Sequence, residues 1–251
     1  MLKSERQELI LNRIDTEGSV QVSDLTKVAN VTEDTIRKDL QELSKKGLVK
    51  RVHGGALKVD ASIVPFEERI DHMSNEKIKL GEKAINLILN KNVIFIDGGT
   101  TNLIFAKTIP NDYKGKVITN SPSIALALSN HPFIEISMLP GQLDKQSKVL
   151  KGTTTVNYLD DIFIELCILG VSSFDFNYGI TVPSLEESII KKKLIEQSEQ
   201  VVAIVTKEKF NTVATYKVDN IGCISYMITD RIFSENEKDI FSKNKIIVID
   251  K

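Results

Sequence analysis

The sequence is short of the residue types that mark several classes of protein. It has no tryptophan, two cysteines and three histidines among 251 residues. Cys167 and Cys223 both lie in apolar, strand-like runs and are too few for a disulfide framework, so we expect reduced, buried thiols. His53, His72 and His131 are scattered, and no Cys/His spacing typical of zinc is present. We therefore expect neither a metal site nor a cofactor.

Long hydrophobic runs and a net charge of one sign are also missing. No apolar stretch approaches the ~18 residues of a membrane-spanning helix, and the amphipathic start "MLKSERQELILNRI" has no apolar signal core. We expect a cytoplasmic protein without a membrane partner. The formal net charge of -1 excludes no partner, so any nucleic-acid-binding surface must be a local feature. The length favours two domains.

The chain changes character along its length. Residues 1–57 are rich in helix signals and are predicted to form one domain, 58–73 show no sustained period and are predicted to be a linker, and 74–251 alternate between helix and strand. Seven strands are predicted, most of them near-continuous apolar runs as in strands covered on both faces: 93–97, 116–120, 133–139, 163–171, 201–206, 224–229 and 245–250. The helices predicted between them include 75–89, 121–130 and 184–198. This pattern predicts an α/β domain with a mainly parallel sheet, whose ligand sites lie at the carboxyl ends of the strands.

The first domain has the parts of a helix-turn-helix. Apolar residues at helical spacing predict a first helix in "SERQELILNRIDTEG", which stops at Gly18, and a short second helix with Val22, Leu25 and Val28 on one face. A turn of about three residues leads to a third helix, which begins after Thr32 as its N-cap and buries Ile36, Leu40 and Leu43. In such a motif the helix that follows the turn enters the major groove of DNA. The segment "GLVKRVHGGA" that follows alternates like a small β-hairpin, so we predict a winged helix-turn-helix.

Charge gathers in the same domain. From Arg37 to Lys58 there are seven basic and two acidic residues, an excess of five positive charges in a nearly neutral chain. The alternative, three amphipathic helices with a solvated face, explains the charge but not its combination with the helix spacing, the cap and the wing. The candidate DNA contacts lie at the start of the third helix and in the wing: Thr32, Glu33, Thr35, Arg37, Lys38, Lys50, Arg51 and His53.

A glycine-threonine turn joins a predicted strand to a helix in "VIFIDGGTTNLIFAK". Gly98 and Gly99 let the backbone approach a ligand closely, and Thr100 and Thr101 add hydroxyl groups at a helix N-terminus, which favours an anion. The alternative is that the glycines only close the turn. Thr119, Asn120 and Ser121 follow the next strand and would face the same crevice. Gly141 and Gly152 either border the site or only form turns in loops. The candidate residues here are Asp97, Gly98, Gly99, Thr100, Thr101, Thr119, Asn120, Ser121, Gly141 and Gly152.

Glu187 and Lys191 are four residues apart and share one helix face. They form either an exposed ion pair, worth ~0.3–0.5 kcal/mol, or part of a site. For a sugar-phosphate isomerase, Asp97, Glu187 and Lys191 would have to supply the base and the electrophilic groups. The chain has no Gly-Lys-Ser/Thr phosphate loop and no nucleophile elbow.

Three segments of the first domain carry a family resemblance. "ERQELIL", "VTEDTIRKDLQEL" and "RVHGGA" occur in the order seen in DeoR-type bacterial transcriptional regulators, and residues 5–56 closely resemble the DNA-binding domain of that family. The resemblance implies that Thr35, Arg37 and Lys38 contact DNA, that the wing residues Arg51 and His53 support them, and that Asp39 and Leu40 are structural.

The resemblance continues over nearly all of the remaining chain. "FEERIDHMSNEKIKLGEKA", "DGGTT", "TNS", "LPGQL", "GVSSFDFNYGIT", "EESIIK" and "KEKF" are similar to segments of the family's sensor domain, whose fold resembles ribose-5-phosphate isomerase. This implies a pocket for a phosphorylated sugar, lined by Glu187, Lys191 and Lys209. At two positions the chain departs from the pattern: Thr206 stands where Asp is common and Glu208 where Ser or Thr is common. A changed ligand or a weakened site would result.

The resemblance implies a DNA-binding repressor of a sugar-metabolism operon, a homodimer or higher oligomer on paired operator half-sites, released by a phosphorylated sugar. It implies a regulator and no enzyme, because "GVSSFDFNYGIT" lacks the acidic loop of the isomerases. Two alternatives stay open: an isomerase-like enzyme carrying a DNA-binding domain, and a regulator without a small-molecule effector. The sequence does not distinguish among sugar phosphates or between repression and activation.

Overall fold

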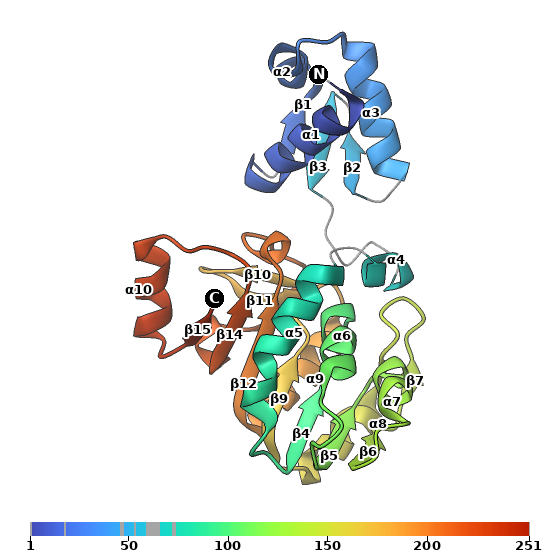
Figure 1. Ribbon diagram of the computed structural model, residues 1–251, viewed down its shortest axis with the longest axis vertical. Coiled ribbons are helices and arrows are strands. Elements are labelled where there is room, and N and C mark those ends of the chain that lie inside the picture. Colours follow the sequence, from blue (N-terminus) through green and yellow to red (C-terminus); the bar gives the residue numbers. More distant parts are fainter. Residues whose placement is uncertain are drawn as a thin grey trace. The chain divides into compact units, whose positions relative to one another are not determined.

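The computed structural model describes residues 2–17, 19–45, 48–52, 54–58, 66–71 and 74–250. The chain divides into two compact units, Met1–Val64 and Pro65–Lys251. The elements of both units are labelled in Figure 1, and each unit is described by itself below.

The first unit combines three helices with a small antiparallel sheet. The helices are α1 (Lys3–Glu17), α2 (Val22–Ala29) and α3 (Glu33–Lys45), and the sheet has the order β1-β3-β2, made of β1 (Ser19–Gln21), β2 (Val49–Val52) and β3 (Gly55–Lys58). The three predicted helices and the predicted hairpin are confirmed. The strand β1 was not predicted, because its residues were expected to begin the second helix.

The core of this unit is made by the apolar stripes of the helices. Ile10 and Ile14 of α1, Leu25 of α2 and Ile36 of α3 are among its buried residues. The prediction for Val28 is wrong, since 49% of its surface is exposed and Ala29 is buried instead. Because α2 begins at Val22, positions three and seven residues later share its buried face, and Val28 falls outside that face.

Local chemistry explains both turns of the unit. Asn30 ends α2 with a φ of 52°, and its N–H donates to the Thr26 carbonyl. The Thr32 hydroxyl accepts from the Thr35 N–H at 3.4 Å, which confirms the predicted N-cap of α3. In the hairpin, a Cβ at Gly55 would lie 2.0 Å from the Val20 carbonyl oxygen, so glycine is required there for β1 to pair with β3.

The second unit is built on a seven-stranded parallel sheet with the order β15-β14-β12-β9-β4-β5-β6. All seven predicted strands are present and all belong to this sheet, with shifted ends. Their bounds are β4 (Val93–Ile96), β5 (Gly115–Thr119), β6 (Ile134–Met138), β9 (Ile164–Leu169), β12 (Ser198–Val205), β14 (Tyr226–Thr229) and β15 (Ile247–Ile249).

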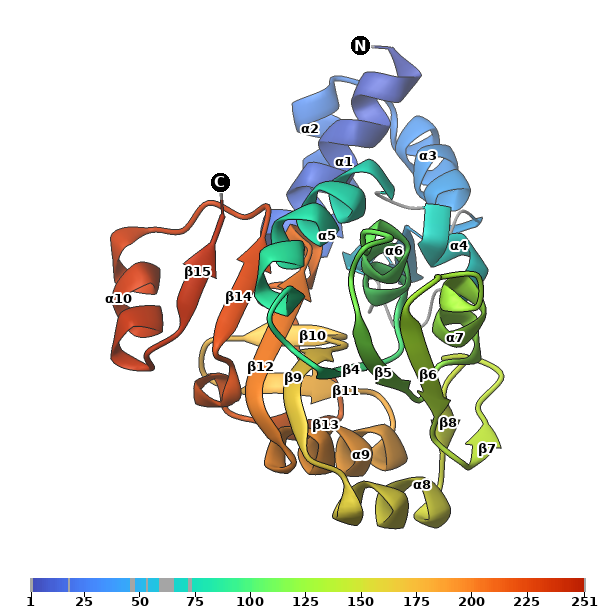
Figure 2. The same cartoon turned by 60° about the horizontal axis from the view of Figure 1, so that its bottom comes forward.

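Two hydrophobic clusters cover the two faces of this sheet. One face packs against α5 (Ser74–Ile88), α6 (Thr100–Thr108) and α7 (Pro122–Leu128), and α5 and α6 lie across it in Figure 2. The other face packs against α9 (Leu185–Glu196) and α10 (Glu235–Lys243). It also packs against a second, antiparallel sheet with the order β10-β11-β13, made of β10 (Ser173–Asp175), β11 (Gly179–Val182) and β13 (Tyr216–Asp219).

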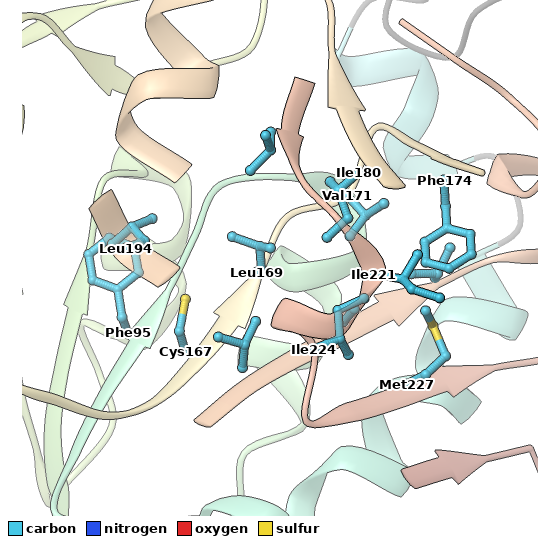
Figure 3. Close-up of a cluster of buried hydrophobic side chains, with 14 of the residues drawn as sticks. Phe95, Cys167, Leu169, Val171, Phe174, Ile180, Leu194, Ile221, Ile224 and Met227 are labelled. Carbon is cyan, nitrogen blue, oxygen red and sulfur yellow. The ribbon is translucent and has the colours of Figure 1, made fainter. Parts of the chain in front are cut away.

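Side chains alternate between these clusters along each central strand. Val202 and Ile204 of β12 belong to the α5 face, whereas Val201, Ala203 and Val205 belong to the other. This arrangement explains why the central strands read as continuous apolar runs. Figure 3 shows part of the second cluster, in which Phe95, Cys167 and Leu169 of the parallel sheet accompany Phe174 and Ile180 of the small sheet.

Besides the strands of the small antiparallel sheet, the structure has further elements where the sequence predicted none. The helix α4 (Phe66–Asp71) falls within the range predicted as a linker, and its Phe66 is buried in the α5 face of the second unit; residues 59–65 and 72–73 of that range lie outside the described residues. A short hairpin, β7 (Gln142–Leu143) with β8 (Leu150–Lys151), precedes α8 (Thr153–Tyr158).

The two cysteines are free, Cys167 buried in β9 and Cys223 half-buried in the 3₁₀ turn Ile221–Cys223. Among the residues that the structure describes, no helix is both long and apolar enough to cross a bilayer.

Candidate functional sites

The start of α3 presents a row of exposed charged side chains. Arg37 donates to Glu33 at 2.8 Å, and Lys38 contacts Asp34 at 2.9 Å. All four side chains are more than half exposed, so each pair contributes little to stability and exchanges readily for another partner. Hydrogen bonding to Asp34 raises the pKa of Lys38, which therefore stays charged. Arg37 and Lys38 thus present two cations on the exposed side of α3 that can exchange their present partners for others.

The inner side of α3 is fixed by a buried ion pair. The Arg6 guanidinium of α1 donates from Nε to Asp39 Oδ2 and from Nη2 to Asp39 Oδ1, the latter at 3.2 Å. Asp39 and Leu40 are both buried, in keeping with a structural role. Further along α3, the Glu42 carboxylate accepts from Lys3 of α1 at 2.6 Å. These contacts fix the orientation of α3 on α1, and thereby the direction in which Arg37 and Lys38 point.

The remaining DNA-binding candidates lie near the cap of α3 and in the wing. Thr32 is exposed and Thr35 half-buried, and their hydroxyl groups lie 3.0 Å apart. Arg51 is exposed on β2. The Lys50 side chain and the whole of His53 lie outside the described residues.

In the second unit, the carboxylate of Asp97 joins four segments at the carboxyl edge of the sheet. It is almost fully buried. Its Oδ1 accepts from the Gly98 N–H at 2.9 Å and from Asn120 Nδ2 at 2.8 Å. Its Oδ2 accepts from the Gly170 N–H at 2.9 Å and from Lys191 Nζ. The ends of β4, β5 and β9 are thereby linked to α9.

Several predicted side chains are already engaged within the protein. The Thr119 hydroxyl donates to the Ile96 carbonyl at 2.6 Å, and Asn120 Oδ1 accepts from the Gly98 N–H at 2.9 Å. Asn102, which sequence reasoning missed, donates to the Asp97 and Ile168 carbonyls at 2.8 and 3.1 Å. These groups hold the turns in place, and a ligand would have to meet other atoms.

Two buried hydroxyl groups near these turns differ from the engaged ones. Thr101 is 4% exposed and Ser121 is 1% exposed, yet neither hydroxyl oxygen has a hydrogen-bond partner in the part of the chain that the structure describes. Buried polar atoms are normally paired. Gly99, the residue before α6, has a φ of 139° and no atom within 4 Å of the position that a Cβ would occupy. The backbone that leads into the first turn of α6 therefore borders open space at Gly99.

Four cationic residues surround this edge. Lys77 of α5 is buried, and its Nζ donates to the Arg69 carbonyl of α4 and to Thr100 Oγ1, the latter at 3.3 Å. Lys209 Nζ donates to the Val171 carbonyl at 2.5 Å. Burial, together with the charges of Arg69, Lys77 and Lys191, lowers the pKa of Lys209 to about 8, while Glu208 opposes the shift. Lys191 and Lys209 contact the carbonyls of Gly170 and Val171, which are neighbours in the chain, and Lys77 contacts the glycine-threonine turn.

Arg69 and Lys77 were missed as site residues, although both lie in the segment "FEERIDHMSNEK" that carried the family resemblance. The alternative that Glu187 and Lys191 form an exposed ion pair is wrong, because Lys191 is 5% exposed and contacts Asp97 and, at 2.7 Å, the Gly170 carbonyl. Glu187 is half-buried on the same helix.

The two candidate glycines differ in their surroundings. A Cβ at Gly141 would lie 2.2 Å from Thr155 Oγ1, so this glycine is needed for the loop itself. Gly152 precedes α8 with a φ of 114° and has open space beside it. Within the described ranges, no group of three His, Cys, Asp or Glu side chains is arranged to hold a metal ion.

The two departures from the family pattern contact each other. The Thr206 hydroxyl donates to Glu208 Oε1, and Glu208 Oε2 is buried without a hydrogen-bond partner in the described chain. Glu208 thus provides a carboxylate at this edge, two residues further along the chain than the position at which the family commonly has Asp.

Two parts of the chain match models of known domains. Residues 6–61 match the DeoR-like helix-turn-helix domain, and residues 72–231 match the DeoR C terminal sensor domain. This chain belongs to the DeoR family. It is a DNA-binding transcriptional regulator and not an enzyme, since the proteins that it is similar to are named as regulators and repressors.

Three such relatives cover almost its full length. The HTH-type transcriptional regulator GolR of Listeria innocua is 29% identical over 92% of this chain and 91% of its own. The HTH-type transcriptional repressor GlcR of Bacillus subtilis is 29% identical over 98% and 95%. The glycerol-3-phosphate regulon repressor of Escherichia coli is 27% identical over 92% of both chains.

Among solved structures, ribose 5-phosphate isomerase A of Methanocaldococcus jannaschii matches 55% of this DeoR-family chain and 54% of its own, with 13% identity and a TM-score of 0.40. A likeness at that level is too low to decide the fold relationship.

Proposed function

We propose that this DeoR-family regulator represses a sugar-metabolism operon and that a phosphorylated sugar, bound at the carboxyl edge of the parallel sheet, lowers its affinity for operator DNA. One observation carries the effector part: Lys77, Lys191 and Lys209 contact groups at an edge where, among the described residues, two buried hydroxyl groups have no hydrogen-bond partner. The names of the relatives, two of them repressors, support the regulatory part.

The proposed DNA contacts are the exposed polar groups of α3 and the wing. Arg37 and Lys38 are long, charged and held only by neighbours on their own helix, so they can turn to phosphates or base edges at little cost. The full proposed set is Thr32, Glu33, Thr35, Arg37, Lys38, Lys50, Arg51 and His53. Operators read by such motifs contain paired half-sites, so the proposed regulator is a homodimer or a higher oligomer. It acts on DNA in the cytoplasm.

The proposed effector site uses an anion's preference for helix N-termini and cations. A phosphate beside Gly99 would meet the first N–H groups of α6, the Thr101 and Ser121 hydroxyls, and the ammonium groups nearby. Asp97 would hold Lys191 and the turns around it instead of touching the phosphate. The proposed set is Asp97, Gly98, Gly99, Thr100, Thr101, Thr119, Asn120, Ser121, Gly141, Gly152, Glu187, Lys191 and Lys209, with Arg69 and Lys77 added.

The proposed mechanism is linkage between two binding equilibria. An effector that binds more tightly to the form with low operator affinity shifts the protein towards that form. A coupling of ~1–3 kcal/mol changes operator affinity by about 5- to 150-fold.

Operator binding of the full chain, titrated with a panel of sugar phosphates and their unphosphorylated sugars, tests this proposal. A phosphorylated member should release DNA without being consumed, and its free sugar should not. Thr101→Val should abolish the release and leave operator affinity intact, because the Thr101 hydroxyl has no hydrogen-bond partner among the described residues.

Thr108→Val is the matched control on the same helix, because the Thr108 hydroxyl already donates to the Phe105 carbonyl at 2.8 Å. If no phosphorylated sugar changes DNA binding, or if Thr101→Val responds as the wild type does, the proposed site is refuted. Turnover of the sugar phosphate would restore the enzyme alternative.

A further inference from the structure

Glu208 has a carboxylate with one satisfied and one unsatisfied oxygen. It lies in the 3₁₀ turn Lys207–Lys209, directly after β12. Its Oε1 accepts the Thr206 hydroxyl, whereas Oε2 is buried and has no partner in the described chain. A buried carboxylate oxygen without a donor is costly, and a donor brought by a ligand would lower that cost.

The turn that carries Glu208 is firmly held. Thr206 is fully buried and its hydroxyl fixes the carboxylate from one side. The Lys207 N–H donates to Asp230 Oδ1 at 2.8 Å, which ties the turn to the end of β14. The Glu208 side chain is therefore held in place, and its Oε2 has a defined position.

Strand alternation places Glu208 at the proposed effector site. Val202 and Ile204 face α5, and Thr206 continues this alternation with extended backbone. Because α5 ends at Ile88, shortly before β4 begins at Val93, its first turns lie at the carboxyl edge of the sheet. Lys77 lies in those turns and contacts Thr100 at 3.3 Å. Glu208 and Lys77 thus share one edge and one face of the sheet, and Lys191 of α9 reaches the same edge from the other face.

The chemistry of a carboxylate limits what it can contact in a ligand. An ionised carboxylate only accepts hydrogen bonds, and it repels a phosphate group. The ligand atom beside Oε2 must therefore be a donor, and the phosphate must lie at the cationic side of the site. A phosphate ester that carries a hydroxyl group at its other end meets both conditions.

We propose that Glu208 is a specificity-determining residue that accepts a hydroxyl group of the effector, so that the site selects hydroxylated phosphate esters over equal-length esters without hydroxyl groups. This inference rests on the proposed effector site. It also explains the pair of departures at Thr206 and Glu208: the threonine holds the carboxylate, and the carboxylate reads the ligand.

Calorimetric titration of the full chain with two matched pairs of ligands tests the inference. The pairs are glycerol 3-phosphate with propyl phosphate, and sorbitol 6-phosphate with hexyl phosphate. For whichever pair binds, the wild type should prefer the hydroxylated ester by about 10- to 100-fold, the range expected for a hydrogen bond to a charged group. Glu208→Met should remove this preference, and Glu208→Gln should retain part of it, because a neutral acceptor bonds less strongly.

Glu199→Gln is the matched control, since Glu199 is exposed at the amino end of the same strand and should leave every affinity unchanged. Operator binding and thermal melting show whether each variant is folded, and Glu208→Gln keeps the shape of the side chain if Glu208→Met is unstable. Equal affinity of the wild type for both members of a pair that binds, or an unchanged preference in a folded Glu208 variant, overturns the inference and leaves the effector site standing. If no ester of either pair and no sugar phosphate of the operator panel binds, the proposed function fails and this inference fails with it.

Discussion

The two units place their charged groups in opposite ways. On α3 the Arg37–Glu33 pair joins residues four apart in the sequence, with side chains 61% and 56% exposed. At the edge of the parallel sheet the Lys191–Asp97 pair joins residues 94 apart, with side chains 7% and 2% exposed. A surface for a large partner needs cations that water already solvates and that can turn to new partners. A site for a small anion needs cations held in a fixed place before the ligand arrives.

This contrast separates what a substitution can break. A cation removed from the exposed surface leaves nothing buried without a partner, so binding is lost but the fold is kept. Removal of one member of a buried pair leaves the other charge in a medium that solvates it poorly, so the fold itself is weakened.

The largest expected effect is at the buried pair. Asp97→Asn should lower the free energy of unfolding of the second unit by about 3–5 kcal/mol, because Lys191 loses its counter-charge inside the protein. Urea denaturation of the full chain, followed by a probe in each unit, measures this loss. Glu135→Gln removes one member of the exposed Lys116–Glu135 pair and should cost less than about 1 kcal/mol. Equal costs for the two substitutions would remove the contrast between buried and exposed pairs.

The next effect is on DNA binding. Arg37→Ala should weaken operator binding by about 5- to 150-fold while the unfolding free energy changes by less than about 1 kcal/mol. A gel-shift titration at several salt concentrations gives both the affinity and the salt slope, which should become shallower as phosphate contacts are lost. Lys238→Ala removes an exposed, paired lysine of α10 and is the control for net charge. Unchanged operator affinity in Arg37→Ala would mean that α3 does not dock through this side.

The smallest expected effect is a dependence of effector binding on pH. Lys209 has a pKa of about 8, so the affinity for a phosphate ester should fall as the pH rises through that value and the ammonium group loses its proton. A phosphate ester is already largely dianionic there, since its second pKa is about 6. Lys38, whose pKa is raised, should keep operator contacts constant over the same range.

The stability of the second unit should change in the other direction. The pKa of Lys209 is lower in the folded chain than its ordinary value of 10.5. Between about pH 8 and that value the unfolded chain binds more protons, so this residue makes the protein more stable as the pH rises. Lys209→Met should flatten both profiles, and Lys207→Met, at the exposed neighbouring position, should leave both as in the wild type. A pH step that persists in Lys209→Met would assign it to another group.

Sequence patterns predicted the parallel sheet well and its surroundings less well. The seven strands were found because both faces of the central ones are covered, which makes them apolar at every position. The strands β10, β11 and β13 are short and mix polar with apolar residues, and α4 is a helix of six residues, too short for a periodic pattern to emerge. In the first unit, the caps and spacing of α2 and α3 are local features, and only β1, which depends on pairing with β3, was missed.

For the candidate site, the sequence located the turns but not the state of the atoms in them. The turns at Gly99 and Ser121 follow from a strand ending where a helix begins, which is visible in the chain. Whether a hydroxyl is engaged depends on which distant carbonyl lies beside it: Thr119 bonds to Ile96, and Thr101 has no partner in the described chain. Sequence reasoning therefore treated engaged and open groups as equals.

The sequence by itself determined the order of elements, the two-part organisation and the family, because helix caps, apolar runs and motif spacing are encoded by neighbouring residues. Only the tertiary structure decided which charges meet. It brought Asp97 to Lys191 in place of Glu187, gathered Arg69, Lys77 and Lys209 at one edge, and joined Thr206 to Glu208 so that a carboxylate stands there. The physical reason is that parallel strands bring their carboxyl ends together whatever their distance along the chain, and electrostatic interactions act across the space between residues.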